Sequence, residues 1–171
     1  MSVREWSTLS YLDPEKLLSG LQAIELEFPL SELPYEVSSL RKRNLRKFGE
    51  ARQCALFCFL MSKVKGFKVE FAHTEKCDYD CIARYMESGT YNYVPIQMKE
   101  YVPENVNLKS DLESILASLT KYKNSSNLVV AIYLNRNFKL DLSELELPKL
   151  NLAEIWIFGS SAPDQSKWVR P

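Results

Sequence analysis

The sequence predicts an α/β protein of the α+β type, in which a mixed central sheet is flanked by helices. One long apolar helix pattern, from about Ser39 to Val64, comes before three strand patterns in close order. A second helix pattern and two further strands follow these three. At 171 residues the chain is long enough to bury one core, with a short extension beside it.

The first 40 residues are expected to form an N-terminal helical extension, and residues 41–171 the main domain. Asp13 and Pro14 are suited to the N-cap and first position of a helix that continues to about Ala23. Pro29 and Pro34 then interrupt regular structure. The sequence leaves open whether this extension is a lid, a dimer arm or a site for a partner.

The long helix is expected to be capped by Ser38 or Ser39 and to end at Gly66. Its second half is almost entirely apolar and should be buried on several sides. Its first two turns are strongly basic, with Arg41, Lys42, Arg43, Arg46 and Lys47.

The remaining elements follow from strand and cap patterns. We expect strands at Phe67–His73, Tyr79–Met86 and within Tyr91–Val102, a turn at 87–90, a helix from Asp111 to about Lys123, and strands at Asn127–Asn135 and Glu154–Phe158. The segment Asn127–Asn135 is continuously apolar, which predicts burial on both faces.

Charge is unevenly distributed although the net charge is zero. Residues 1–40 carry seven acids and two bases, residues 41–68 nine bases and one acid, and residues 69–171 eleven bases and fourteen acids. A globally basic nucleic-acid-binding protein is therefore excluded, but the basic stretch offers a local phosphate-binding face. The alternative is an ordinary solvated helix face.

The N-terminus has no apolar signal region, and no apolar run reaches the roughly 18 residues of a membrane span. We therefore expect a cytoplasmic protein without membrane contact. Four cysteines, Cys54, Cys58, Cys77 and Cys81, should be reduced there. Their spacing allows a zinc module, but Cys54 and Cys58 fit buried helix positions better.

The chemistry is expected on two neighbouring strands. Alternation along 94–99 puts Gln97 and Lys99 on one strand face, and a hairpin would bring Asp80 beside them. Carboxylate and amide oxygens suit Mg²⁺. The lysine could orient the attacking water or offset charge on a phosphate.

Asp80 and the run Gln97-Met98-Lys99 make the chain resemble the PD-(D/E)XK nuclease superfamily, which has the restriction-endonuclease-like αβββαβ core. The resemblance covers most of the chain beyond residue 40. It implies a nuclease that uses Mg²⁺ or Mn²⁺ and acts on DNA. It assigns catalytic roles to Asp80, Gln97, Lys99 and Glu50, with Asp80, Gln97 and Glu50 as metal ligands. The basic turns would then bind the nucleic acid.

The match has departures. Tyr79 stands where the family has a proline, Asp78 competes with Asp80 as the acid, and Gln97 replaces an acid. Other interpretations also remain. Gln97 and Lys99 could lie on a solvated strand edge, and Glu50 could pair with Arg46 four residues before it. The protein could be a non-catalytic relative that binds nucleic acid or protein, and a homodimer stays open.

The only histidine, His73, follows the first strand near the expected metal. A lone histidine is more often structural or solvated than catalytic, so we assign it no catalytic role from the sequence.

Overall fold

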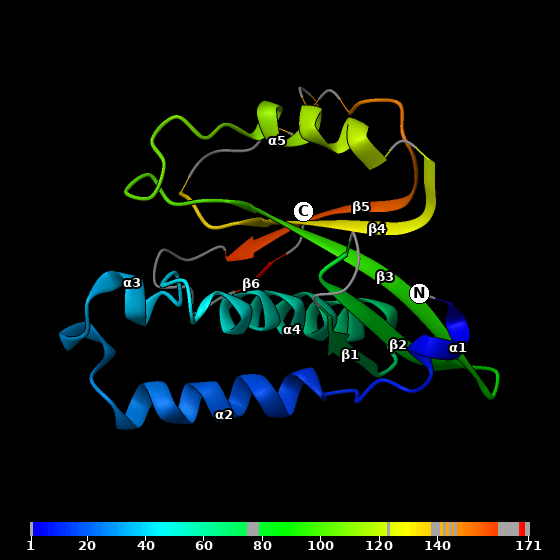
Figure 1. The fold of residues 1–171 in the computed structure, drawn as a ribbon, viewed down its shortest axis with the longest axis horizontal. Coiled ribbons are helices and arrows are strands. Elements are labelled where there is room, and N and C mark those ends of the chain that lie inside the picture. The colour runs from blue at the N-terminus through cyan, green and yellow to red at the C-terminus, as the bar shows by residue number, and fades with distance from the viewer. Residues whose placement is uncertain are drawn as a thin grey trace. The chain divides into compact units, whose positions relative to one another are not determined.

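The computed structural model has α+β architecture with strands of both relative directions (Figure 1). It describes residues 2–74, 79–122, 124–137, 141, 143, 145, 147–160 and 168–169. The chain divides into two compact units, Met1–Ile96 and Gln97–Pro171. We describe each unit by itself.

The first unit contains helices α1 (Val3–Trp6), α2 (Pro14–Glu27), η1 (Leu30–Glu32), α3 (Tyr35–Ser38) and α4 (Arg46–Lys65), and strands β1 (Val69–His73) and β2 (Cys81–Glu87). Strand β3 (Thr90–Tyr101) crosses the unit boundary after Ile96. The three strands predicted here are therefore present, with boundaries that differ by one or two residues.

Strands β1, β2 and the first part of β3 form an antiparallel meander. The hairpin between β2 and β3 closes at Ser88 and Gly89, which both have positive φ, 50° and 79°. Two successive positive φ values match the twist of a two-residue hairpin, and glycine adopts them at little cost. The turn predicted at 87–90 is thus confirmed.

Helix α2 begins as predicted and continues to Glu27, beyond the expected end. The Asp13 side chain accepts hydrogen bonds from the backbone N–H groups of Glu15 and Lys16. Figure 1 shows α2 alongside α4, against which it packs. Leu12 also forms an antiparallel bridge with Phe71 of β1. Residues on both sides of position 40 therefore contribute to the first unit, and the division at residue 40 stays a prediction.

The expected start of the long helix is wrong. Helix α4 begins at Arg46, and residues 41–45 form a turn. The backbone N–H groups of Arg41 and Lys42 both donate to the carbonyl of Glu36, and Leu40 has φ 58°. This left-handed residue closes α3, where Ser39 is the C-cap and not the N-cap of α4. Three of the five basic residues thus precede the helix.

The second half of α4 carries the core of the first unit. Cys54, Ala55, Phe57 and Cys58 are buried, and α4 packs on β1 and β2. Gly66 ends the helix as predicted, with the left-handed φ of 75° that favours glycine.

The second unit contains α5 (Leu112–Ser118), η2 (Leu119–Tyr122), β4 (Asn124–Leu134), β5 (Asn151–Ser160) and β6 (Trp168–Val169). Strands β4 and β5 are parallel, and β6 is antiparallel to β5. Asp111 caps α5 as predicted, accepting from the backbone N–H of Ser114. Leu128 to Tyr133 are all buried, which confirms the predicted burial of this strand.

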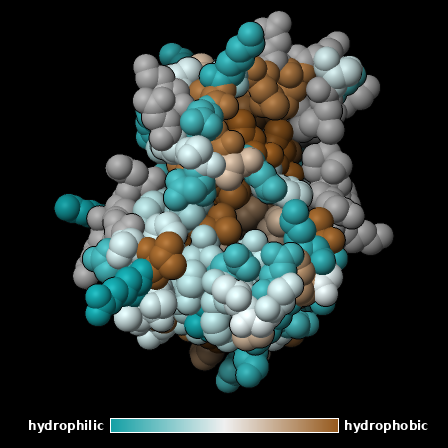
Figure 2. Space-filling model, turned by 90° about the vertical axis from the view of Figure 1, so that its right-hand side faces the viewer, coloured by the Kyte–Doolittle hydropathy of each residue, from teal (hydrophilic) through white to brown (hydrophobic). Residues whose placement is uncertain are grey.

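Figure 1 shows α5 lying over β4 and β5. Ile155, Trp156 and Ile157 of β5 are only half-buried, and Figure 2 shows apolar side chains at the surface of the second unit. Among the described residues, no helix is long and apolar enough to cross a membrane.

A chain of charged and aromatic side chains ties the segment before α2 to the meander. Lys68 Nζ lies 2.9 Å from Asp13 Oδ2 and 3.2 Å from Glu70 Oε1. Glu70 accepts a hydrogen bond from Nε of Arg84 at 3.2 Å, and the Arg84 guanidinium lies 4.0 Å from the centre of the Tyr11 ring. Burial raises the pKa of the Glu70 carboxyl, but the hydrogen bonds from Arg84 and Lys68 outweigh it and hold this pKa below 4.5.

We expect Glu70→Gln to lower the free energy of unfolding by about 1–2 kcal/mol at pH 7, since it removes charge-assisted hydrogen bonds. A carboxyl whose pKa is depressed by folding contributes stability above its unfolded value, 4.5, and loses it as pH falls through the folded value. The difference between wild type and variant should therefore shrink between pH 5 and pH 3, measured by urea unfolding.

Glu87→Gln, at the exposed end of β2, is the control and should change stability little at either pH. An equal deficit of Glu70→Gln at pH 7 and pH 3 would contradict the electrostatic explanation.

Candidate functional site

The backbone of Asp80 is held on two sides, although the residue comes just before β2. Its N–H donates to the carbonyl of Ile96 at 2.9 Å, and its carbonyl accepts from the N–H of Thr74 at 3.0 Å. Ile96 is the residue before Gln97 in the chain. The meander therefore fixes the position of Asp80 at the end of the strands where β1 finishes.

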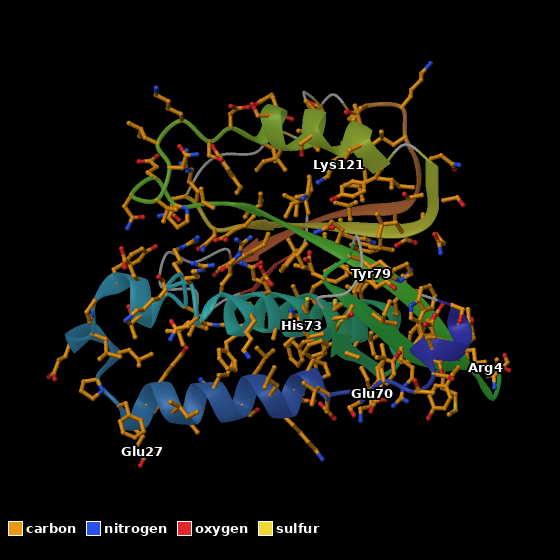
Figure 3. The ribbon with its side chains drawn as sticks, viewed as in Figure 1. Arg4, Glu27, Glu70, His73, Tyr79 and Lys121 are labelled. Carbon is orange, nitrogen blue, oxygen red and sulfur yellow. The ribbon has the colours of Figure 1, made fainter. Side chains whose placement is uncertain are left out.

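The neighbouring Tyr79 is fixed by the N-terminal segment. Its hydroxyl accepts a hydrogen bond from the indole N–H of Trp6 at 2.9 Å, and the two rings meet edge to face. Trp6 is buried. Tyr79, which departs from the pattern that the sequence resembles, thus has a structural partner of its own. Figure 3 labels Tyr79 and, beside α4, His73.

Glu50 lies on the face of α4 that packs on the sheet. It precedes Cys54 and Cys58 at intervals of four residues, which places the three side chains on one helix face. The two cysteines are fully buried, whereas 30% of the Glu50 side chain is exposed. Glu50 is therefore where this buried face opens to solvent.

Glu50 has two neighbours in the first unit. Arg46 Nε donates to its Oε1 at 3.0 Å, which is the i,i+4 ion pair that the sequence left as an alternative. Its other oxygen, Oε2, lies 3.7 Å from Nε2 of His73. A distance of 3.7 Å is too long for a hydrogen bond.

Three buried cysteines pack in the core of the first unit next to the elements that carry Glu50 and His73. Cys54 and Cys58 of α4 contact Cys81 of β2, and all three are free and buried. Burial raises the pKa of the Cys54 thiol, and the nearby carboxylates of Asp80 and Glu50 raise it further. Both carboxylates therefore act electrostatically on the same buried thiol, although they come from different elements.

The zinc module that the sequence left as an alternative needs all four cysteines and stays a hypothesis. The fourth cysteine, Cys77, lies outside the described residues, as does the competing acid Asp78.

His73 is the residue that sequence reasoning undervalued. It ends β1, and in the register it is opposite Cys81. Its Nε2 is buried and has no hydrogen-bond partner within the described part of the chain. The available signal was alternation in Val69-Glu70-Phe71-Ala72-His73, which puts His73 on the same face as the buried Val69 and Phe71.

Gln97 and Lys99 lie in the second unit on the half of β3 beyond the boundary. Ile96 and Met98 are buried and Gln97 and Lys99 half-buried, as the predicted alternation requires. The Gln97 amide donates to the carbonyl of Met98 at 3.2 Å. The Lys99 ammonium lies 5.6 Å from the centre of the Tyr122 ring, within reach of a cation–π interaction.

The structure thus places Glu50 beside His73 in the first unit, which also contains Asp80, and places Gln97 and Lys99 on one strand in the second. The convergence of these two groups stays a prediction. Within the described ranges, no group of three or more His, Cys, Asp and Glu side chains is arranged to hold a metal ion.

The basic residues lie directly before Glu50. Arg41 is half-buried, while the other four are exposed: Lys42, Arg43, Arg46 and Lys47. Arg46 and Lys47 form the first turn of α4, so the cationic surface adjoins the carboxylate of Glu50.

Comparison of the chain with protein-family models, with curated proteins and with solved structures found no match.

The buried thiols give a direct test of this packing. In a Cys77→Ser background we expect none of the three remaining thiols to react with Ellman's reagent in the folded protein, because all three are fully buried. All three should react in 8 M urea. Rapid modification of even one thiol under native conditions would show that α4 does not pack on β2 in this way.

Proposed function

We propose that this protein is a metal-dependent nuclease that hydrolyses phosphodiester bonds in DNA. The observation that carries the proposal is the main-chain hydrogen bond, 2.9 Å long, by which the N–H of Asp80 is held to the carbonyl of Ile96 at the end of the meander. The main chain anchors Asp80 to Ile96, and Gln97-Met98-Lys99 follows immediately in the chain.

The order of elements supports the same proposal. Helix α4, strands β1, β2 and β3, helix α5 and strand β4 follow one another in the order of the restriction-endonuclease-like core. The resemblance assigns the family's acids to Asp80 and Glu50 and its terminal pair to Gln97 and Lys99. We adopt that assignment as part of the proposal.

The donor set fits a hard divalent cation, because Glu50, Asp80 and Gln97 all offer oxygen. Arg46 holds Oε1 of Glu50 in this structure, so Glu50 would offer an ion its other oxygen, Oε2, or exchange that partner. When bound, Mg²⁺ or Mn²⁺ would supply Lewis-acid polarisation of the scissile phosphate.

The other groups would act on the substrate directly. The ammonium of Lys99 would orient the attacking water or offset the charge that develops on the phosphate. The exposed bases before and within the first turn of α4 would hold the phosphate backbone next to Glu50.

A non-catalytic relative is the second candidate. The Arg46–Glu50 ion pair favours it, since this carboxylate already has a cationic partner. Such a protein would bind nucleic acid or another protein through the same surface without cleaving.

We expect cleavage of DNA that depends on Mg²⁺ or Mn²⁺. Asp80→Ala should abolish it by removing a charged ligand. Lys99→Ala should lower the rate about 10²–10³-fold while metal binding survives, because it removes one electrostatic group from the transition state. Gel assays on single-stranded, duplex and branched DNA would measure the rate, with metal affinity from calorimetry.

Gln97→Glu tests the amide separately. If Gln97 is a ligand, the added charge should tighten Mg²⁺ binding. Lys109→Ala, on a loop of the second unit, is the matched control for Lys99 and should cleave at the wild-type rate. Wild-type protein that binds DNA but cleaves none of the three substrates would favour the non-catalytic relative.

The basic surface should be visible in the salt dependence of DNA binding. Replacing Arg43 and Lys47 with alanine removes two exposed cations and should reduce the slope of log Kobs against log[salt] by about two units, one per lost phosphate contact. Fluorescence anisotropy at 50–300 mM salt would measure it. An unchanged slope would mean that these side chains form an ordinary solvated surface.

A further inference from the structure

We propose that two copies of this chain associate through the edge of the first unit formed by residues 24–48. The partner at this edge is a second copy of the chain, related to the first by a twofold axis. The inference goes beyond the proposed function and does not rest on it.

The apolar side chains at this edge need a cover. Between the end of α2 and the start of α3, five large apolar side chains are 43–83% exposed: Ile24, Leu26, Phe28, Leu33 and Tyr35. Phe48, in the first turn of α4, is also exposed. Single exposed apolar residues are common on protein surfaces, whereas a concentration of them marks a surface that another molecule covers.

Helix α2 carries its apolar face beyond the part that the first unit covers. Leu17, Leu21 and Ile24 follow at helical intervals and share one face. The first two are half-buried, but Ile24 is exposed, as is every residue from Gln22 to Pro29. Figure 1 shows this end of α2 at the same edge of the unit as α3 and the start of α4. The exposed surface therefore continues from one element to the next.

The charges at this edge identify the partner. Its acids lie at the end of α2 and in the segments that follow, and its bases lie just before α4. Three acids and two bases are exposed, and none of them forms an ion pair within the part of the chain that the structure describes: Glu27, Glu32, Glu36, Lys42 and Arg43. Figure 3 labels Glu27 at the end of α2. The edge thus offers unpaired charges of both signs around apolar side chains.

Neighbouring charges behave differently. Glu25 of α2 pairs with Arg52 of α4 at 3.3 Å, and Arg46 pairs with Glu50 at 3.0 Å. These pairs lie within the first unit and hold α2 and α4 in place. The remaining acids and bases of the edge are therefore the ones that are free to meet another molecule.

A second copy satisfies both signs of charge at once. In an isologous contact the same surface meets itself, so that residue i contacts residue j and j contacts i. With the apolar side chains at the axis, the acids of each copy face the bases of the other at two symmetric places. An apolar centre with a charged rim is the usual anatomy of a protein interface, and complementary charges fix its register.

A nucleic acid fits this edge less well. It would pair with the bases, but the acids would repel it and the apolar side chains would stay exposed. Under the proposed function Arg43 contacts DNA, so a second copy and DNA are alternative partners of that side chain.

Sedimentation velocity of the full-length protein at low salt, from low to high micromolar concentration, tests the contact without nucleic acid. Wild type should become dimeric as concentration rises. Leu26→Asp should raise the dimer Kd at least about tenfold, because it places a charge among side chains that lose water in the dimer. Leu108→Asp is the matched control, since Leu108 is 76% exposed in the second unit, and it should associate like wild type.

A monomeric wild type at every concentration would overturn the inference. So would a dimer that Leu26→Asp leaves unchanged, or one that both leucine variants weaken equally. Because both leucines are exposed, neither substitution disturbs the core, and circular dichroism would confirm that each variant is folded.

Charge reversal tests the twofold arrangement itself. Glu27→Lys with Glu32→Lys makes the rim basic, and Lys42→Glu with Arg43→Glu makes it acidic. Each double variant alone sets like charges against each other and should be monomeric at concentrations where wild type is dimeric. An equimolar mixture of the two should form a heterodimer, because opposite charges then face each other at both places.

Glu104→Lys with Glu113→Lys is the control of equal charge change, since both residues are exposed in the second unit, and it should dimerise like wild type. A mixture of the two rim variants that stays monomeric would overturn the proposed pairing of acids with bases. Homodimers of either rim variant as stable as those of wild type would overturn it as well.

Discussion

The contact between α4 and β2 through three cysteine side chains determines how close the helix comes to the sheet. Cys54, Cys58 and Cys81 are small and fully buried, and Cys81 contacts both of the others. A cysteine side chain has only one heavy atom more than an alanine side chain, so the helix can approach the sheet closely at these positions. Larger residues would push α4 outward, and the residues one turn before Cys54 would move with it.

The candidate site lies at the open end of this contact. Moving from Cys58 to Cys54 to Glu50, each step is four residues along one face of α4, and exposure rises from none to 30% of the side chain. The same change occurs along β1, where the buried Phe71 is followed on its face by the partly exposed His73. The end of the core therefore places an acid and an imidazole near each other, with solvent on one side and the buried thiols on the other. Such a boundary is where a cation can reach protein ligands without full desolvation.

Local rules predicted much of this arrangement. Asp13 and Asp111 as caps, Gly66 as a helix end and Ser88-Gly89 as a hairpin turn each follow from the conformation or hydrogen bonding of one or two residues. The start of α4 failed because it depends on competition. Ser39 is a good N-cap in isolation. However, the backbone carbonyl of Glu36 accepts hydrogen bonds from the N–H groups of Arg41 and Lys42, and the chain turns at Leu40 before a new helix can begin.

The site itself was predictable only in part, for a physical reason. Asp80, Gln97 and Lys99 could be proposed because strand alternation and a short hairpin relate them through local sequence. The partnership of Glu50 with His73 joins residues 23 positions apart on a helix and a strand, and depends on how the thiols set the spacing between them. No periodicity encodes that spacing. A lone histidine in a strand gives no sign of its partner in the sequence, and only the packing of α4 on β1 shows that its buried nitrogen lies 3.7 Å from a carboxylate oxygen.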